Sequence, residues 1–113
     1  MKDFKFSYDG DNDDLFIYSP DSKSKGAVEL GNFVFDFDEK ENLVAIQILE
    51  ASKVLSKLVS KIIEIARIKG IKVGIINFRN MAFVKIELST QTDKETISMP
   101  IPRIKEKSPA LSY

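Results

Sequence analysis

The chain has 113 residues, of which 43% are hydrophobic and 30% charged, as in an ordinary single globular domain. Its 17 basic and 17 acidic residues cancel, so its overall charge does not attract nucleic acid or anionic lipid. The absence of cysteine and histidine leaves nucleophilic catalysis without a thiol or an imidazole base. No apolar signal segment opens the sequence, and charged residues interrupt its densest apolar stretch, 54–68, so we expect a soluble, cytoplasmic protein and no membrane contact.

Five strand segments are predicted before a helix. Phe4, Phe6 and Tyr8 alternate with polar residues, and an acidic turn follows them. The next strand, 15–18, is apolar on both faces, and Gly31-Asn32 suits a two-residue turn. We expect an antiparallel meander of segments 4–8, 15–18, 27–30, 33–37 and 43–49.

A long amphipathic helix is predicted from about Glu50 or Ser52 to Lys69, with Ser52 as its N-cap and Gly70 as its stop. Its apolar residues fill about half of the helix circumference, more than the ~100° needed to lie on a sheet. The excess indicates a second layer, a second segment or a partner subunit. Ile68 falls on the polar side and has no explanation in this pattern.

A second meander is predicted after the helix, with strands at 72–78, 82–88 and 96–101. A change of apolar phase around Gly74 indicates a β-bulge. The predicted fold is a single α+β domain, residues 1–102: two antiparallel meanders, of about five and three strands, joined by one long helix packed on the sheet. Residues 103–113 are expected to form a loosely ordered C-terminal tail.

Two acidic clusters are candidate metal sites. Asp9, Asp11 and Asp13 have the spacing of the first ligands of a calcium loop, but the glycine and the final glutamate of that loop are missing. Asp36, Asp38, Glu39 and Glu41 form the second cluster, and the two clusters could hold a divalent cation together if they lay close to each other. The alternative, which we favour, is that these residues belong to solvated turns.

A row of lysines is a candidate nucleic-acid site. Lys53, Lys57 and Lys61 recur every four residues, so on one helix they could follow a line of phosphates. The alternative, which we favour, is the solvated face of an amphipathic helix. Phe33, Phe35 and Phe37 could stack on bases if exposed, but this pattern is more typical of a core strand.

Several segments together resemble a known family. They are Tyr8-Asp9, Asp14-Leu15-Phe16-Ile17, Phe35-Asp36-Phe37-Asp38 and 44–52 (VAIQILEAS). Across residues 4 to about 58 this pattern is similar to the prokaryotic family called domain of unknown function 2283. The resemblance implies a small strand-rich domain with a helix, no established activity and no catalytic residues to transfer. It also implies that Asp11 and Asp13 are incidental, and it makes an antitoxin-like role beside a small toxin-like partner an option.

We therefore expect a non-catalytic protein-interaction domain without a cofactor. It would act through the helix or an exposed sheet edge, as a homodimer or with a small protein partner. One alternative is a divalent metal-binding protein or metalloenzyme that uses the five aspartates named above. Another is nucleic-acid binding through the lysine row.

Overall fold

The computed structural model describes residues 1–59, 64–78 and 81–102. Within these ranges, eight antiparallel strands form one curved sheet in the order β3-β4-β5-β2-β1-β6-β7-β8. The strands are β1 (Lys2–Asp9), β2 (Asp14–Tyr18), β3 (Gly26–Leu30), β4 (Phe33–Phe37), β5 (Leu43–Ile48), β6 (Gly70–Phe78), β7 (Met81–Ser89) and β8 (Lys94–Pro102). Between β5 and β6 lie the α-helix α1 (Ala51–Leu58) and a short 3₁₀ turn, η1 (Ile65–Arg67).

The first five strands are not a simple meander. Strands β3, β4 and β5 pair in sequence, but β5 then pairs with β2 instead of leaving the sheet, with Ile17 opposite Ile46. Three consecutive strands and an earlier strand beside the last of them form a Greek-key arrangement. The polar connection between β2 and β3 therefore runs past two strands.

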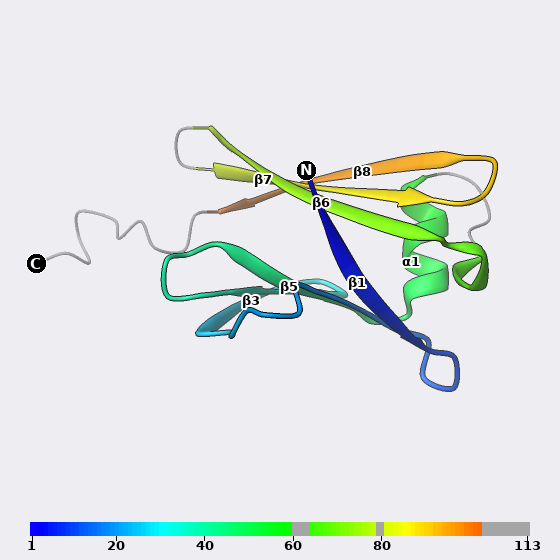
Figure 1. Ribbon diagram of the computed structural model, residues 1–113, viewed down its shortest axis with the longest axis horizontal. Coiled ribbons are helices and arrows are strands. Elements are labelled where there is room, and N and C mark those ends of the chain that lie inside the picture. Colours follow the sequence, from blue (N-terminus) through cyan, green and yellow to red (C-terminus); the bar gives the residue numbers. More distant parts are fainter. Residues whose placement is uncertain (60–63, 79–80, 103–113) are drawn as a thin grey trace, which may run out of the picture.

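Strand β1 joins two halves of the sheet. Its residues Lys2–Phe4 pair with β6, whereas residues 5–9 pair with β2. We call the paired unit of residues 5–9 with β2 to β5 the first half, and β6 to β8 the second half. Figure 1 shows the halves as two facing layers, with β1 crossing diagonally between them and α1 at one end.

The hydrophobic core fills the space between the inner faces of the two halves. Alternate residues of each strand point inward, so Leu15 and Ile17 of β2 belong to the same core cluster as Val84 and Ile86 of β7. Helix α1 adds Ala51 and Leu55, both fully buried. The largest fully buried side chains are Phe35, Leu15, Ile17, Ile46, Ile48, Leu55, Ile71, Ile86, Ile101 and Val84.

The predicted α+β fold with a long packed helix is wrong, because α1 has eight residues and the described chain is mostly antiparallel sheet. Glu64 is extended (φ −97°, ψ 105°), so no helix runs through to Lys69. In the 3₁₀ turn, residues three apart lie on the same side, and both Ile65 and Ile68 reach the core. A continuous α-helix would have left Ile68 on its polar side. None of the described helices has the length and apolarity required to cross a membrane.

The predictions made at Gly31 and Gly74 differ in outcome. Gly31 has a positive φ of 58° in the turn between β3 and β4, which confirms the predicted two-residue turn. The bulge predicted at Gly74 is wrong, because β6 pairs with β7 without a shift from Gly70 to Phe78. A Cβ at position 74 would instead lie 2.9 Å from Cγ of Met1, so Gly74 lets the start of the chain approach β6. The predicted tail, 103–113, lies outside the described residues.

Shortening a buried side chain of α1 tests the contribution of the helix to the core. We expect Leu55→Ala to lower the free energy of unfolding by about 2–5 kcal/mol, because it leaves a cavity at a fully buried position. Leu58→Ala on the same helix is the control, since Leu58 is 47% exposed. Urea denaturation followed by circular dichroism measures both. Equal effects of the two changes would contradict this placement of the helix.

Candidate functional site

The acidic turn after β1 is organised by Asp9. Its Oδ1 accepts hydrogen bonds from the backbone N–H groups of Asp11 (3.0 Å) and Asn12 (3.3 Å), and its Oδ2 accepts one from Asn12 Nδ2 (2.8 Å). The Asn12 side chain and these backbone donors hold the pKa of Asp9 below its ordinary value, because they stabilise the ionised carboxylate. Asp9 thus has the role of an Asx turn residue.

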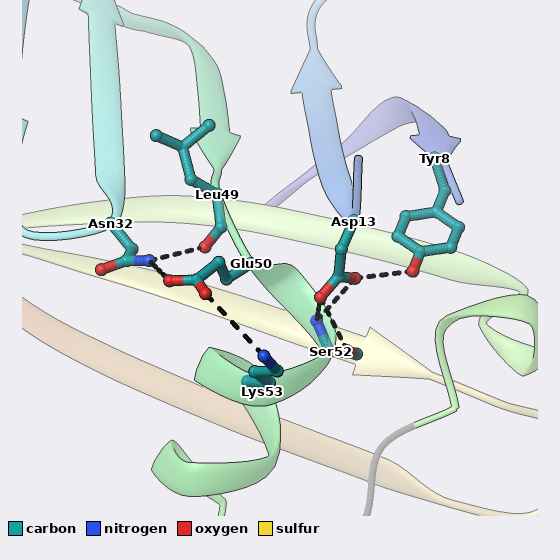
Figure 2. A network of polar contacts seen from close by, with 7 residues as sticks. All are labelled: Tyr8, Asp13, Asn32, Leu49, Glu50, Ser52 and Lys53. Carbon is teal, nitrogen blue, oxygen red and sulfur yellow. Dashed lines mark hydrogen bonds and ion pairs between the residues drawn. The ribbon is translucent and has the colours of Figure 1, made fainter. Parts of the chain in front are cut away.

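Asp13 connects this turn to helix α1, as Figure 2 shows. Its carboxylate accepts hydrogen bonds from Ser52 N–H (3.1 Å to Oδ1 and 3.3 Å to Oδ2) and from Ser52 Oγ (2.8 Å to Oδ2). Tyr8 Oη donates to Oδ1 of the same carboxylate (2.6 Å). The backbone N–H of Ala51 donates to the Asp13 carbonyl oxygen (2.8 Å).

These contacts cap the helix from a distant part of the chain. The N-cap residue, Glu50, is in the left-handed region (φ 53°) and its side chain makes no capping hydrogen bond. The first N–H groups of a helix lack intrahelical acceptors, and a carboxylate there also interacts favourably with the helix dipole. The prediction of Ser52 as the N-cap is therefore wrong. Ser52 is the donor, and Asp13, 39 residues earlier, is the acceptor.

A second contact holds the opposite side of the helix start. Asn32 Nδ2 donates to the Leu49 carbonyl oxygen (3.0 Å) and to Glu50 Oε2 (3.1 Å), and Lys53 Nζ lies 3.9 Å from Glu50 Oε1 (Figure 2). The β3–β4 turn and the β1–β2 turn are thereby both tied to α1.

The ionisation of Asp13 and Tyr8 follows from their contact. Desolvation alone raises the pKa of Asp13, but the hydrogen bonds from Tyr8 and Ser52 outweigh it and lower the pKa below the ordinary value. The same hydrogen bond raises the pKa of the Tyr8 hydroxyl, because ionised tyrosine could not donate to the carboxylate. At neutral pH the pair is a protonated phenol beside a charged carboxylate.

The structure separates the two predicted acidic clusters. The antiparallel pairing places Leu15, next to the first cluster, opposite Ile48, whereas Asp36 lies opposite Ala45, at the other end of the first half. Asp38 lies beyond Asp36 and accepts hydrogen bonds from backbone N–H of Asn42 (2.8 Å) and Lys40 (2.9 Å), which lower its pKa.

The five aspartates therefore do not form one site. Among the residues with described positions, no group of three or more acidic side chains is arranged to hold a metal ion. Metal binding by either turn alone stays a prediction.

The structure describes only two of the three lysines in the predicted row. Lys53 and Lys57 are exposed on α1, which ends at Leu58, and Lys61 lies outside the described residues. Phe33, Phe35 and Phe37 are buried, which confirms the prediction of a core strand.

The outer face of the first half carries an aromatic pair that the site predictions missed. The pairing register places Lys5, Tyr18, Ala45 and Asp36 side by side across four strands. The adjacent row across the same strands is Ser7, Phe16, Gln47 and Val34.

Phe16 and Tyr18 stack with ring centroids 5.1 Å apart, and Phe16 is 42% exposed. We call Phe16, Tyr18, Val34, Ala45 and Gln47 the aromatic face. The sequence contained a signal for this face, because residues 15–18 are apolar on both faces of the strand. A strand that contacts the core on one side needs apolar residues on that side alone.

A cleft of about 630 Å³ opens between the halves at the end opposite α1. Its lining includes the apolar residues Phe4, Phe37 and Val73 and the charged residues Asp38 and Lys40. It contains no histidine or cysteine, because the chain has none.

Comparison with known proteins assigns the first half to a family. Residues 5–52 match the model of a family described as "Protein of unknown function (DUF2283)". This segment belongs to the DUF2283 family. The finding confirms the resemblance seen in the sequence and attaches no activity to it.

Two curated archaeal relatives match the DUF2283 segment. An uncharacterised protein of Methanocaldococcus jannaschii is 42% identical over 52 residues, which are 46% of this chain and 45% of the relative. A protein of Methanosarcina mazei named "Putative hypoxanthine phosphoribosyltransferase" is 35% identical over 48 residues, 42% of this chain and 39% of the relative. The matched part thus spans less than half of either relative. No solved structure matches the chain.

Removal of the Asp13 carboxylate tests the capping contact. We expect Asp13→Ala to lower the free energy of unfolding by about 1–2 kcal/mol, because the start of α1 loses its acceptor. Asp11→Ala in the same turn is the control and should change stability by less than about 0.5 kcal/mol. Urea denaturation at neutral pH measures both, and equal stabilities of the two variants would contradict the role of Asp13.

The stability difference between wild type and Asp13→Ala should also depend on pH. The pKa of Asp13 is lower when folded than when unfolded, so its contribution is complete above the ordinary aspartate pKa of about 4 and is lost as the pH falls through the lowered value. We expect the stability difference between wild type and Asp13→Ala to shrink below about pH 4. Denaturation curves across this range measure it. A difference that stays constant as the solution is acidified would contradict the assignment.

Proposed function

We propose that this chain is a non-catalytic protein-interaction domain and that its contact surface is the aromatic face of the first half. The observation that carries the proposal is the stack of exposed Phe16 on half-buried Tyr18, on the outer side of a sheet whose inner side already supplies the core. Aromatic side chains are enriched at protein interfaces because they bury large areas with little loss of side-chain freedom. Among the described elements, α1 lies on the opposite, inner side of this sheet.

The charges around the aromatic face favour a protein over a nucleic acid. Lys5 lies at one side, but Glu29, Asp36 and Asp14 occupy outer-face positions of β3, β4 and β2. A surface that binds single-stranded nucleic acid combines stacking aromatics with a positively charged groove. Here Lys5 and Lys69 lie near Tyr18, but the outer-face acids interrupt any continuous positive groove of the kind that phosphates require.

The ionisable groups support a non-catalytic role. Catalytic carboxylates that exchange protons near neutral pH usually have raised pKa values, up to about 6–7. The pKa values of Asp9, Asp13 and Asp38 are all lowered, and the hydrogen bonds responsible hold turns and the helix start. These carboxylates remain ionised and have structural partners.

The proposal also specifies which segment of the chain binds the partner, what kind of partner it is and where the protein acts. The aromatic face lies within the DUF2283 segment, which is the part of the chain that the curated relatives match. An antitoxin-like pairing with a small protein is one form of this function. We assign it to the cytoplasm, since the chain contains none of the cysteines that stabilise many small secreted domains.

Site-specific photocrosslinking tests the proposal. A photoreactive phenylalanine analogue at position 16, introduced in cells of the source organism, should give covalent adducts with protein. The same analogue at position 76 is the matched control, because Ile76 is 49% exposed on the outer face of the second half. No adducts from position 16, or equal adducts from both positions, would contradict the proposal.

A further inference from the structure

We propose that the partner bound at the aromatic face is a second copy of this chain. The two copies would be related by a two-fold axis that runs parallel to the strands, between β2 and β5. This inference rests on the proposed function and makes it specific. It follows from the positions of two opposite charges on either side of the aromatic face.

Lys5 and Asp36 lie in the same row at its two sides. The register aligns Lys5 with Tyr18, Tyr18 with Ala45, and Ala45 with Asp36, so the charges stand on β1 and β4 with β2 and β5 between them. A two-fold axis between β2 and β5 places β1 of one copy over β4 of the other. Lys5 of each copy then faces Asp36 of its partner, and the pair forms twice.

The same axis matches large side chains with small or flexible ones. Tyr18 of β2 comes to lie over Ala45 of β5, which has the smallest side chain in its row and is already buried at 7% exposure. Phe16 comes to lie over Gln47 in the adjacent row. The stacked ring pair of each copy therefore meets the low part of the other copy's face, which allows both stacks to be covered.

Other axes do not pair the charges. If the axis lay along β5 itself, Lys5 would face the Ala27 position on β3. An axis across the strands, midway between the two rows, would place β1 over β1 and set Lys5 against Ser7. Of these three arrangements, only the first gives Lys5 an acidic partner. Ser24 Oγ donates a hydrogen bond to Oδ1 of Asp36 (3.1 Å).

Charge reversal and charge exchange test this arrangement. Sedimentation velocity at micromolar concentrations should show that the wild-type chain is a dimer. Lys5→Asp and Asp36→Lys should each weaken dimerisation by about tenfold or more, because each creates two like-charge contacts. The double variant Lys5→Asp/Asp36→Lys should restore dimerisation, since it exchanges the charges and keeps the pairing.

Controls separate this effect from general changes in charge or folding. Lys72→Asp alters an exposed lysine on the outer face of the second half and should leave the dimer unchanged. Circular dichroism and urea denaturation of each variant identify any loss of folding. For a charge-reversed variant that does not fold, Lys5→Gln and Asp36→Asn replace it and should also weaken the dimer.

The outcomes distinguish the two proposals. A wild-type chain that stays monomeric, a dimer insensitive to both charge reversals, or a double variant that is not restored would each overturn the second-copy assignment. If position 16 still crosslinks to a different protein, the interaction surface stands and only its partner is wrong. If the chain is monomeric and position 16 gives no adducts, both proposals fail.

Discussion

The hydrogen bonds from Ser52 to Asp13 are the interaction on which the arrangement of the other elements depends. An isolated helix of eight residues is too short to be stable in water, so α1 exists only through its tertiary contacts. Leu55 and Ala51 supply the buried apolar part of these contacts, and the Asp13 carboxylate supplies the polar part. Asp13 has a positive φ of 56°, an uncommon conformation for a residue other than glycine, and these hydrogen bonds offset its cost. The turn and the helix thus stabilise each other, and together they close one end of the core.

The strands could be located from sequence because their signal is local. Alternation of apolar and polar residues directly reports which side of a strand faces the core. The helix could not be predicted in the same way, because one apolar pattern covers both α1 and the 3₁₀ turn with Ile65 and Ile68. A period of 3.6 residues fits part of this segment by chance, and the burial of Ile68 shows where it fails.

Contacts between distant residues explain the other differences. The position of Ser52 before an apolar helix is a good local cap signal, but its partner lies 39 residues earlier and only the fold brings them together. Likewise, the sequence does not say that β5 returns to β2, which sends Asp13 and Asp36 to opposite ends of the first half. The aromatic face also depends on this pairing. Phe16 and Tyr18 lie on the same face of one strand, but Ala45 and Val34 join them only through β5 and β4.

Strand β1 pairs with β6 at its start and with β2 further on, so the boundary between the two halves of the sheet lies within β1. The family match begins at residue 5, and residue 5 is where β1 leaves β6 and starts to pair with β2. The first half is therefore a unit in sequence as well as in hydrogen bonding. Residues Lys2–Phe4 extend β1 beyond this unit and pair with β6, the first strand of the sheet that follows the helix. An architecture of this kind allows the first half to be combined with a different second sheet, while the outer surface of the first half is left unchanged.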